Sequence, residues 1–174
     1  NQRDVFIDVA LAIVAFSLVA SGTYLLNDAR DLESDRLHPV KRDRPIAAGL
    51  VSVRLAVVAG CVLMLLGGAL GVMVHGPFAV VLGVYLATTV AYTLGLKHVA
   101  VIDIAVVASG YILRAIAGGA ATGVPISKWF LIVASFGSLF MVAGKRHGEH
   151  LDLGAEGPEV RPTLGVYPAA YLRY

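Results

Sequence analysis

Long apolar segments run through this chain, and their length constrains the fold more than any other feature of the sequence. Hydropathy places them at about 5–26, 53–74, 78–96, 99–122 and 128–144. Each is close to the roughly 20 residues with which a helix crosses the hydrocarbon core of a bilayer. Because a backbone in lipid must satisfy its own polar groups and no alternating strand pattern is present, we expect an all-α, polytopic transmembrane helix bundle.

The composition favours a membrane protein and excludes a soluble or disulfide-stapled one. Hydrophobic residues make up 57% of the 174 residues and charged residues 15%, whereas a soluble domain carries about 25% charged residues. Cys61 is the single cysteine, so no disulfide can form within the chain. The sequence lacks an initial methionine and ends in an apolar stretch near 162–174, so we expect one domain that is a fragment of a longer protein.

Lysine and arginine gather in alternate connections between the apolar segments. The segment 27–52 holds five of them, the turn 75–77 holds none, and the next connection holds Lys97. A further basic group follows residue 144. Since cytoplasmic loops are enriched in lysine and arginine, we expect 27–52, 97–98 and 145–161 to face the cytoplasm from a multi-pass protein of the plasma membrane.

An acidic motif, NDARDLESD, follows the first apolar segment directly. If the helix continues through the motif, Asp28, Asp31 and Asp35 project from one stripe about 60° wide. Tyr24 shares this stripe and Asn27 lies at its edge. Carboxylate and amide oxygens crowded on one face repel one another unless a cation lies among them, and such hard ligands suit Mg²⁺.

A basic segment, HPVKRDRPIAAG, comes next and supplies Lys41, Arg42 and Arg44. Mg²⁺ usually binds through one or two carboxylates plus substrate phosphates, so a diphosphate is its expected partner. The three cations are charge-assisted donors for phosphate oxygens that the metal does not reach. The alternative is a solvated helix end followed by a positive loop, but such an end would not need its carboxylates on one face.

Other polar side chains in the apolar segments are candidates for the same site, because charges in a bilayer are rare and usually functional. Arg114 and Asp103 share a helix face about 16 Å apart, and we expect Arg114 to reach a phosphate. The alternative for both is an ion pair between helices. Lys97 is either a phosphate ligand or a snorkelling residue. Tyr24 is either a ligand of a diphosphate or ribose oxygen or an interfacial anchor.

The acidic motif resembles the N-D-x-x-D-x-x-x-D motif of the UbiA-type intramembrane prenyltransferases, and RPIAAG resembles the basic segment that follows it there. More narrowly, YTLGLKHVAVIDI, YILRAIAGGAAT and FGSLFMVAGKRHGE make the chain similar to the decaprenyl-phosphate phosphoribosyltransferases of actinobacterial cell-wall synthesis. Members of the family have nine transmembrane helices. The resemblance implies that the five apolar segments correspond to helices two to six.

The second acidic motif of that family, D-x-x-x-D, is altered here, because Lys145 stands at its first position and Glu149 at its last. The resemblance therefore implies one Mg²⁺, a phosphoribosyl diphosphate donor, and a polyprenyl phosphate acceptor steered by Lys145 and Arg146. The catalytic residues expected are Asp28, Asp31 and Asp35, which hold the metal together with Asn27; the substrate ligands expected are Tyr24, Lys41, Arg42, Arg44, Lys97, Arg114, Lys145, Arg146 and Glu149.

Two other functions stay open at this point. A prenyltransferase of the same superfamily would use a prenyl diphosphate to modify an aromatic or haem acceptor. A transporter would line an ion path with the acids, although their place at a helix end rather than at mid-bilayer speaks against it. No nucleic-acid partner is expected, and a homo-oligomer is left open.

Overall fold

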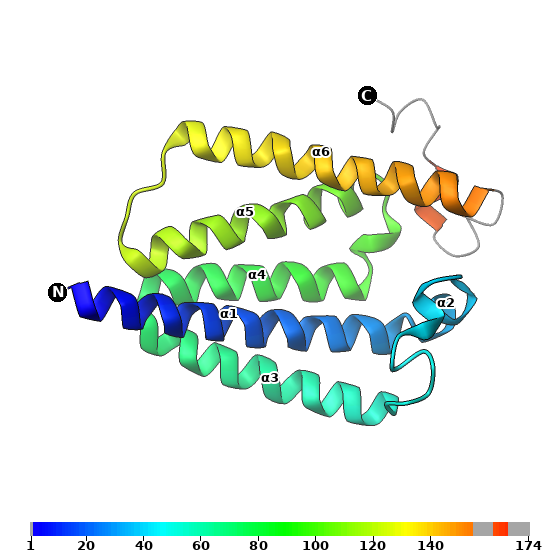
Figure 1. Ribbon diagram of the computed structural model, residues 1–174, viewed down its shortest axis with the longest axis horizontal. Coiled ribbons are helices and arrows are strands. Elements are labelled where there is room, and N and C mark those ends of the chain that lie inside the picture. Colours follow the sequence, from blue (N-terminus) through cyan, green and yellow to red (C-terminus); the bar gives the residue numbers. More distant parts are fainter. Residues whose placement is uncertain (1, 155–161, 167–174) are drawn as a thin grey trace.

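Five long helices form the bundle that the computed structural model describes for residues 2–154 and 162–166 (Figure 1). They are α1 (Gln2–Arg30), α3 (Val53–Val74), α4 (Gly76–Leu94), α5 (Ile102–Thr122) and α6 (Lys128–Leu153). All five are long and apolar enough to cross a membrane, and the described residues contain no strand. The prediction of an all-α transmembrane bundle is therefore confirmed.

Four short helices lie in those polar connections that the structure describes. α2 (Leu32–Leu37) and η1 (Lys41–Asp43) follow α1, η2 (Leu96–His98) follows α4, and η4 (Pro162–Gly165) comes after α6. The additional helix predicted near 162–174 falls largely outside the residues that the structure describes.

Helix α6 is longer than hydropathy predicts. The last apolar segment is expected to end at residue 144, but the helix continues to Leu153. Hydropathy marks the part of a helix that suits lipid, and Lys145 and Arg146 end that part without ending the hydrogen-bonded backbone. The prediction that the segment after residue 144 is a loop is therefore wrong as far as residue 153, and KRHGE lies on a helix.

The acidic motif bridges a break between two helices. α1 ends at Arg30, and Asp31 adopts φ −89° and ψ 11° before α2 begins at Leu32. The amide of Asp31 still donates to the carbonyl of Asn27, and the amide of Asp35 donates to the carbonyl of Asp31, both at 2.8 Å. These bonds follow the helical i to i−4 pattern. The acids therefore stay near the register that the sequence predicts.

Glycines bring α1 and α3 close together along their length (Figure 1). A Cβ on Gly67 would lie 2.7 Å from the carbonyl oxygen of Ala15 and 2.8 Å from Cγ2 of Val19. A Cβ on Gly22 would lie 2.6 Å from the carbonyl oxygen of Gly60. Such close approach of backbones is how helices associate in lipid, where no hydrophobic effect drives them together.

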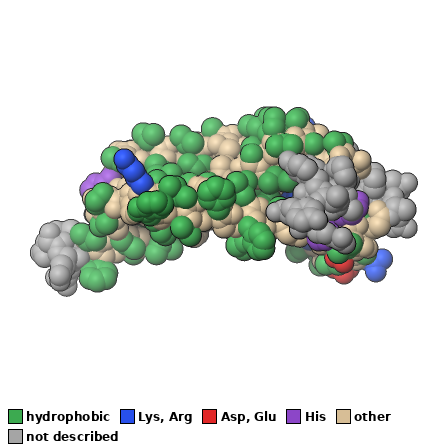
Figure 2. Space-filling model, turned by 90° about the horizontal axis from the view of Figure 1, so that it is seen from above, with side chains coloured by type: hydrophobic (Ala, Val, Ile, Leu, Met, Phe, Trp, Pro, Cys, Tyr) green, Lys and Arg blue, Asp and Glu red, His purple; other side chains and the backbone are tan. Residues whose placement is uncertain are grey.

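Polar segments collect at one end of the bundle. α2, η1, η2 and the C-terminal part of α6 lie together at the right of Figure 1, away from the N-terminus and the connection between α5 and α6. At the other end, Nε2 of His75 lies 3.3 Å from Oδ2 of Asp8. Figure 2 shows hydrophobic side chains over the middle of the molecule on the side viewed. The segments richest in lysine and arginine thus share one end, as their alternation predicts.

Candidate functional site

A cavity of about 210 Å³ lies among the polar segments at this end of the bundle. The end of α1, with α2 and η1, forms one wall, η2 a second, and α6 a third. Nine of the residues predicted for the site line it: Asn27, Asp31, Asp35, Lys41, Arg44, Lys97, Lys145, Arg146 and Glu149. The fold therefore gathers into one cavity the segments that the sequence suggests belong together.

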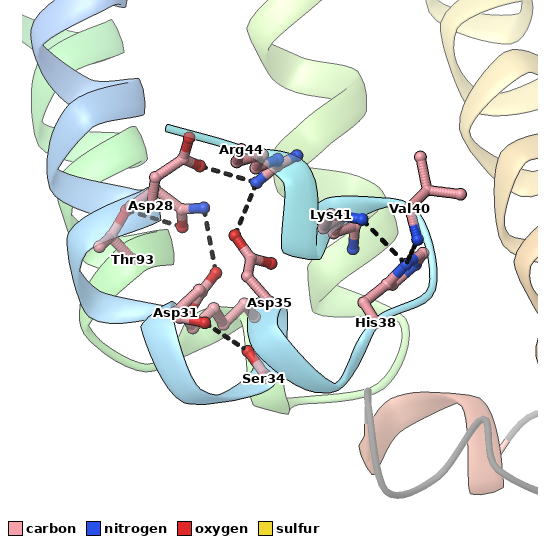
Figure 3. Close-up of polar contacts among 11 residues, drawn as sticks. Asp28, Asp31, Ser34, Asp35, His38, Val40, Lys41, Arg44 and Thr93 are labelled. Carbon is pink, nitrogen blue, oxygen red and sulfur yellow. Dashed lines mark hydrogen bonds and ion pairs between the residues drawn. The ribbon is translucent and has the colours of Figure 1, made fainter. Parts of the chain in front are cut away.

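The wall formed by the end of α1 with α2 and η1 carries Asp28, Asp31 and Asp35 and is called the acidic wall below. Two cations hold it together. Nη1 of Arg44 donates to Oδ1 of Asp28 at 2.8 Å and to Oδ2 of Asp35 at 3.0 Å, so this guanidinium links α1 to α2 (Figure 3). The ammonium of Lys97 binds Oδ1 of Asp31 closely. The three carboxylates are thereby shared between two cations, which offsets the repulsion expected among them.

The oxygen atoms of this wall suit one magnesium ion. Asn27, Asp31 and Asp35 present amide and carboxylate groups to the same cavity. Asn27 is held in place because its Nδ2 donates to Oδ2 of Asp31 at 3.0 Å and its Oδ1 accepts from Thr93 at 3.4 Å. Among the described residues, no three His, Cys, Asp or Glu side chains form a metal cluster by themselves. Mg²⁺ takes one or two carboxylates and completes its shell with phosphates and water, so the donor set fits a metal that binds together with a phosphorylated ligand.

Lys97 lies inside the site rather than at the membrane surface. Its side chain is only 9% exposed, because η2 carries it from the end of α4 towards α1. A buried ammonium is tolerated when a carboxylate compensates it, as Asp31 does here. This burial argues against the snorkelling alternative for Lys97.

Four further lining residues were not predicted: the apolar Val107 and the polar Ser34, Tyr92 and His98. None of the three polar residues occupies a defined position of a recognised motif, so the residue types alone do not single them out. Their positions carry the only usable signal, since Ser34 lies within the acidic motif and His98 follows Lys97. Oγ of Ser34 also donates to the carbonyl of Asp31 at 2.9 Å, which supports the break between α1 and α2.

The wall contributed by α6 carries Lys145, Arg146 and Glu149. Lys145 is exposed, whereas Arg146 is 3% exposed. Nη1 of Arg146 binds Oε2 of Glu149 closely, and its Nε lies 3.5 Å from Oδ2 of Asp103. Of the two cations expected to steer a lipid phosphate, Lys145 reaches the cavity from the surface, while Arg146 is held between two carboxylates.

Tyr24 and Arg114 lie in a different cavity, of about 520 Å³, between α1 and α5. Nη2 of Arg114 donates to the hydroxyls of Tyr24 at 3.2 Å and Tyr85 at 3.3 Å. The remaining lining is mostly apolar or small, as with Phe16 and Ala117. Arg114 therefore lies in a largely apolar groove between α1 and α5. Asp103 does form an ion pair between helices, and its partner is Arg146.

Two other predicted residues do not line either of these cavities. Arg42 is exposed on η1. Asp28 is part-buried on α1 and connects to the first cavity through its bond with Arg44. Asp28 therefore acts on the acidic wall by orienting a cation.

The turn that leads into η1 is held by His38. Its Nδ1 accepts hydrogen bonds from the amides of Val40 at 3.2 Å and Lys41 at 3.4 Å (Figure 3). These bonds require a neutral imidazole whose Nδ1 carries no proton. Burial lowers the pKa of His38 below its ordinary value, and the charge of Lys41 lowers it further. The neutral ring thus helps to keep Lys41 at the cavity.

Comparison with known proteins gives matches along nearly the whole chain. Residues 3–145 match the UbiA prenyltransferase family. Decaprenyl-phosphate phosphoribosyltransferase of Mycobacterium tuberculosis is 51% identical over 171 residues, which cover 98% of this chain and 57% of the relative. The enzyme of the same name from Corynebacterium glutamicum is 49% identical over 176 residues, which cover 100% of this chain and 53% of the relative. The chain thus spans about half the length of these curated relatives.

A solved structure shares the fold at much lower sequence identity. It is that of a UbiA homolog from Archaeoglobus fulgidus bound to GPP and Mg²⁺, with a TM-score of 0.80 and 18% identity. The match covers 90% of this chain and 55% of that chain. At this identity the likeness establishes the arrangement of helices and not the substrate.

Proposed function

The chain belongs to the UbiA prenyltransferase family, and we propose that it is part of an enzyme that transfers the 5-phosphoribosyl group of phosphoribosyl diphosphate to a polyprenyl phosphate such as decaprenyl phosphate. The reaction joins a lipid phosphate oxygen to the anomeric carbon of ribose and releases diphosphate. The observation that carries this proposal is the similarity of almost the whole chain to proteins named decaprenyl-phosphate phosphoribosyltransferase.

The charges around the first cavity support a phosphorylated donor. Acids from α1 and α2 meet cations from η1 and η2 there, which is the combination that a metal-bound diphosphate needs. On α6, Lys145 stands where a second metal site would need an acid. One metal-binding wall and one cationic side chain suit a diphosphate donor and an anionic acceptor.

The donor is held by the acidic wall and its neighbours. Asn27 and Asp31, with Asp35 beside them, would hold Mg²⁺, which when bound neutralises charge on the diphosphate leaving group. Lys97 and Arg44 donate to diphosphate oxygens and exchange their carboxylate contacts for these bonds. This work is positioning and electrostatic stabilisation, and the carboxylates also stabilise positive charge that develops on the sugar.

The acceptor approaches from the membrane. The groove between α1 and α5 takes the isoprenoid chain, because its lining is largely apolar. Tyr24 in this groove precedes Asp28 by four residues, or about 6 Å along a helix. A lipid phosphate at the end of the groove nearest Asp28 can therefore lie within reach of the donor, and Lys145 is the exposed cation at the cavity that can meet it. A phosphate monoester is already ionised at neutral pH, so no strong general base is needed.

The reaction takes place at the cytoplasmic surface of the plasma membrane in this proposal. Phosphoribosyl diphosphate is soluble and its acceptor is embedded in lipid, so the two can meet only at that boundary. The enrichment of lysine and arginine in the segments around the cavity supports a cytoplasmic orientation.

A direct assay tests the proposal. The full-length protein, purified in detergent with Mg²⁺, is given decaprenyl phosphate and either phosphoribosyl diphosphate or geranyl diphosphate, and the lipid products are identified by mass spectrometry. We expect a phosphoribosylated lipid with the first donor and none with the second. Product formed only from geranyl diphosphate with an aromatic acceptor would overturn the proposal. So would ion or solute transport in liposomes without any covalent product.

A further inference from the structure

A buried ionic cluster joins the start of α5 to the end of α6. Asp103 is completely buried and Arg146 is 3% exposed. Nε of Arg146 lies 3.5 Å from Oδ2 of Asp103, while its Nη1 binds Oε2 of Glu149. Thr163 in η4 donates from Oγ1 to the same Oδ2 at 3.5 Å. The cluster thus places one guanidinium between two carboxylates that come from different helices.

Arg146 depends on both carboxylates for its position. A buried charge is stable only when neighbouring charges and hydrogen bonds compensate it. Among the residues that the structure describes, Nε of Arg146 has no hydrogen-bond partner, so Asp103 holds this end of the guanidinium by charge. Neutralising Asp103 would free the guanidinium to turn, and Glu149 would turn with it.

Glu149 is the member of the cluster that matters for a ligand. It lines the cavity together with Arg146, whereas Asp103 does not. Its carboxylate is already paired with a guanidinium, so it is less suited to a metal ion than the carboxylates of the acidic wall. A carboxylate held in this way remains a good acceptor for neutral hydroxyl groups. Ribose presents two adjacent hydroxyls that can donate to such an acceptor.

We propose that Asp103 is a positioning residue that, through Arg146, directs the carboxylate of Glu149 at the ribose hydroxyls of the donor. This inference rests on the proposed function, because it names the part of the donor that the α6 wall recognises. It makes Glu149 a determinant of donor specificity, and it gives Arg146 a role in orienting Glu149 rather than in binding lipid phosphate.

The test uses the full-length enzyme with Asp103→Asn, Glu149→Gln, their double variant, and Asp8→Asn as the control. We expect each of the first two to raise KM for phosphoribosyl diphosphate by about tenfold, the effect of losing a hydrogen bond to a charged group. The KM for decaprenyl phosphate and the Mg²⁺ concentration for half-maximal rate should stay unchanged. The donor KM of the double variant should equal that of Glu149→Gln alone, because Asp103 acts on the donor only through Glu149. Asp8→Asn weakens an ion pair with His75 at the opposite end of the bundle and should leave the donor KM unchanged.

A second donor reports on the ribose hydroxyls themselves. With 2-deoxyribosyl 5-phosphate 1-diphosphate, the difference in KM between the natural enzyme and Glu149→Gln should shrink. If Asp103→Asn does not fold as judged by gel filtration in detergent, Arg146→Lys serves instead. Lysine keeps the charge but lacks the planar guanidinium that spans two carboxylates. Arg146→Lys should therefore raise the donor KM as Asp103→Asn is expected to do.

Three outcomes would overturn the inference while leaving the proposed function intact. One is a multiplicative loss of roughly a hundredfold in the double variant, which would mean that Asp103 acts independently of Glu149. Another is a change in acceptor KM or Mg²⁺ dependence in place of donor KM. The last is an equal donor effect from Asp8→Asn, which would point to general loosening of the fold. Failure of the natural enzyme to form phosphoribosyl lipid would instead reject the proposed function.

Discussion

At the scale of single residues, Asp31 connects two walls of the first cavity, because it contacts residues of both α1 and η2. Its carboxylate binds the ammonium of Lys97 and accepts from Asn27, and its backbone forms the break between α1 and α2. Removing this carboxylate would leave a buried ammonium without compensation and would also take away an oxygen suited to Mg²⁺. Asp28 and Asp35 share Arg44, so removal of either carboxylate leaves the guanidinium paired with the other.

Asp31→Ala should therefore nearly abolish activity. We expect kcat/KM for phosphoribosyl diphosphate to fall by about 100-fold or more, which corresponds to roughly 3 kcal/mol of lost transition-state stabilisation. Glu33→Ala is the matched control, because its side chain is 85% exposed and pairs only loosely with Arg36 at 3.6 Å. That control should stay within about twofold of the natural enzyme. Full activity in Asp31→Ala would contradict the assignment of this wall.

His38 should make the turn before η1 sensitive to acid. Because the fold lowers the pKa of His38, the unfolded chain takes up its proton first as the pH falls. The contribution of the neutral ring to stability is therefore present above its ordinary pKa of about 6.5 and is lost below it. We expect the thermal midpoint to drop between pH 7 and pH 5.

The control for this pH effect is His38→Asn. An asparagine Oδ1 can accept the same two backbone amides and does not titrate. The drop in the thermal midpoint should therefore be smaller in His38→Asn. An equal drop in both proteins would show that other groups are responsible.

At the scale of helices, the contact between α1 and α3 positions the acidic motif. α1 carries the motif at its C-terminal end, and its distance from α3 is set by positions at which only hydrogen fits. Gly67 is the clearest of these, because an added Cβ would meet backbone as well as side-chain atoms of α1. A shift of α1 would move the wall of the cavity with it.

Gly67→Ala and Gly68→Ala form a matched pair that measures this packing. A methyl group at Gly67 would lie 2.7 Å from the carbonyl oxygen of Ala15, so we expect a loss of about 1–3 kcal/mol in the free energy of unfolding. Nothing lies within 4 Å of a Cβ at Gly68, so this variant should be neutral or slightly more stable. Unfolding in mixed micelles would give both values. Equal effects would mean that α1 and α3 are less tightly packed than described.

At the scale of the whole molecule, the bundle is polarised. The charged segments lie at one end of the bundle (Figure 1). The first cavity lies among these segments, and the groove between α1 and α5 is lined largely by apolar side chains. In the proposed function, this polarity lets a water-soluble anion and a lipid reach neighbouring sites. Orientation in the membrane is therefore a property on which the proposed function depends.

Cysteine labelling in a Cys61→Ala background measures that orientation. Glu33→Cys lies beside the cavity end, and Val124→Cys lies in the exposed connection between α5 and α6. A membrane-impermeant maleimide should label position 124 in intact cells and position 33 only in inverted vesicles. The reverse pattern would place the cavity outside the cytoplasm and would contradict the proposal.

The sequence predicts the framework of the site well. Runs of apolar residues predict five long helices, and the alternation of lysine and arginine predicts which connections share an end. The helical register of the acidic motif predicts one stripe for Tyr24, Asp28, Asp31 and Asp35. Asp31 and Asp35 line the first cavity, whereas Asp28 reaches it through Arg44 and Tyr24 lines the groove between α1 and α5. The sequence underestimates the length of α6. Hydropathy marks the part of a helix that suits lipid, and that part ends at Lys145, whereas the helix itself continues to Leu153.

The sequence by itself determined that the described part of the chain is helical, that five of its helices are long and apolar enough to cross a membrane, and that acids and bases meet at one end. The tertiary structure alone decided which charges pair: Lys97 with Asp31 across 66 residues, Arg44 with Asp28 and Asp35, and Arg146 with Asp103. Hydropathy and register are properties of neighbouring residues and can be read along the chain. An ion pair depends instead on the distance and burial of groups far apart in sequence, and only the packing of helices sets these.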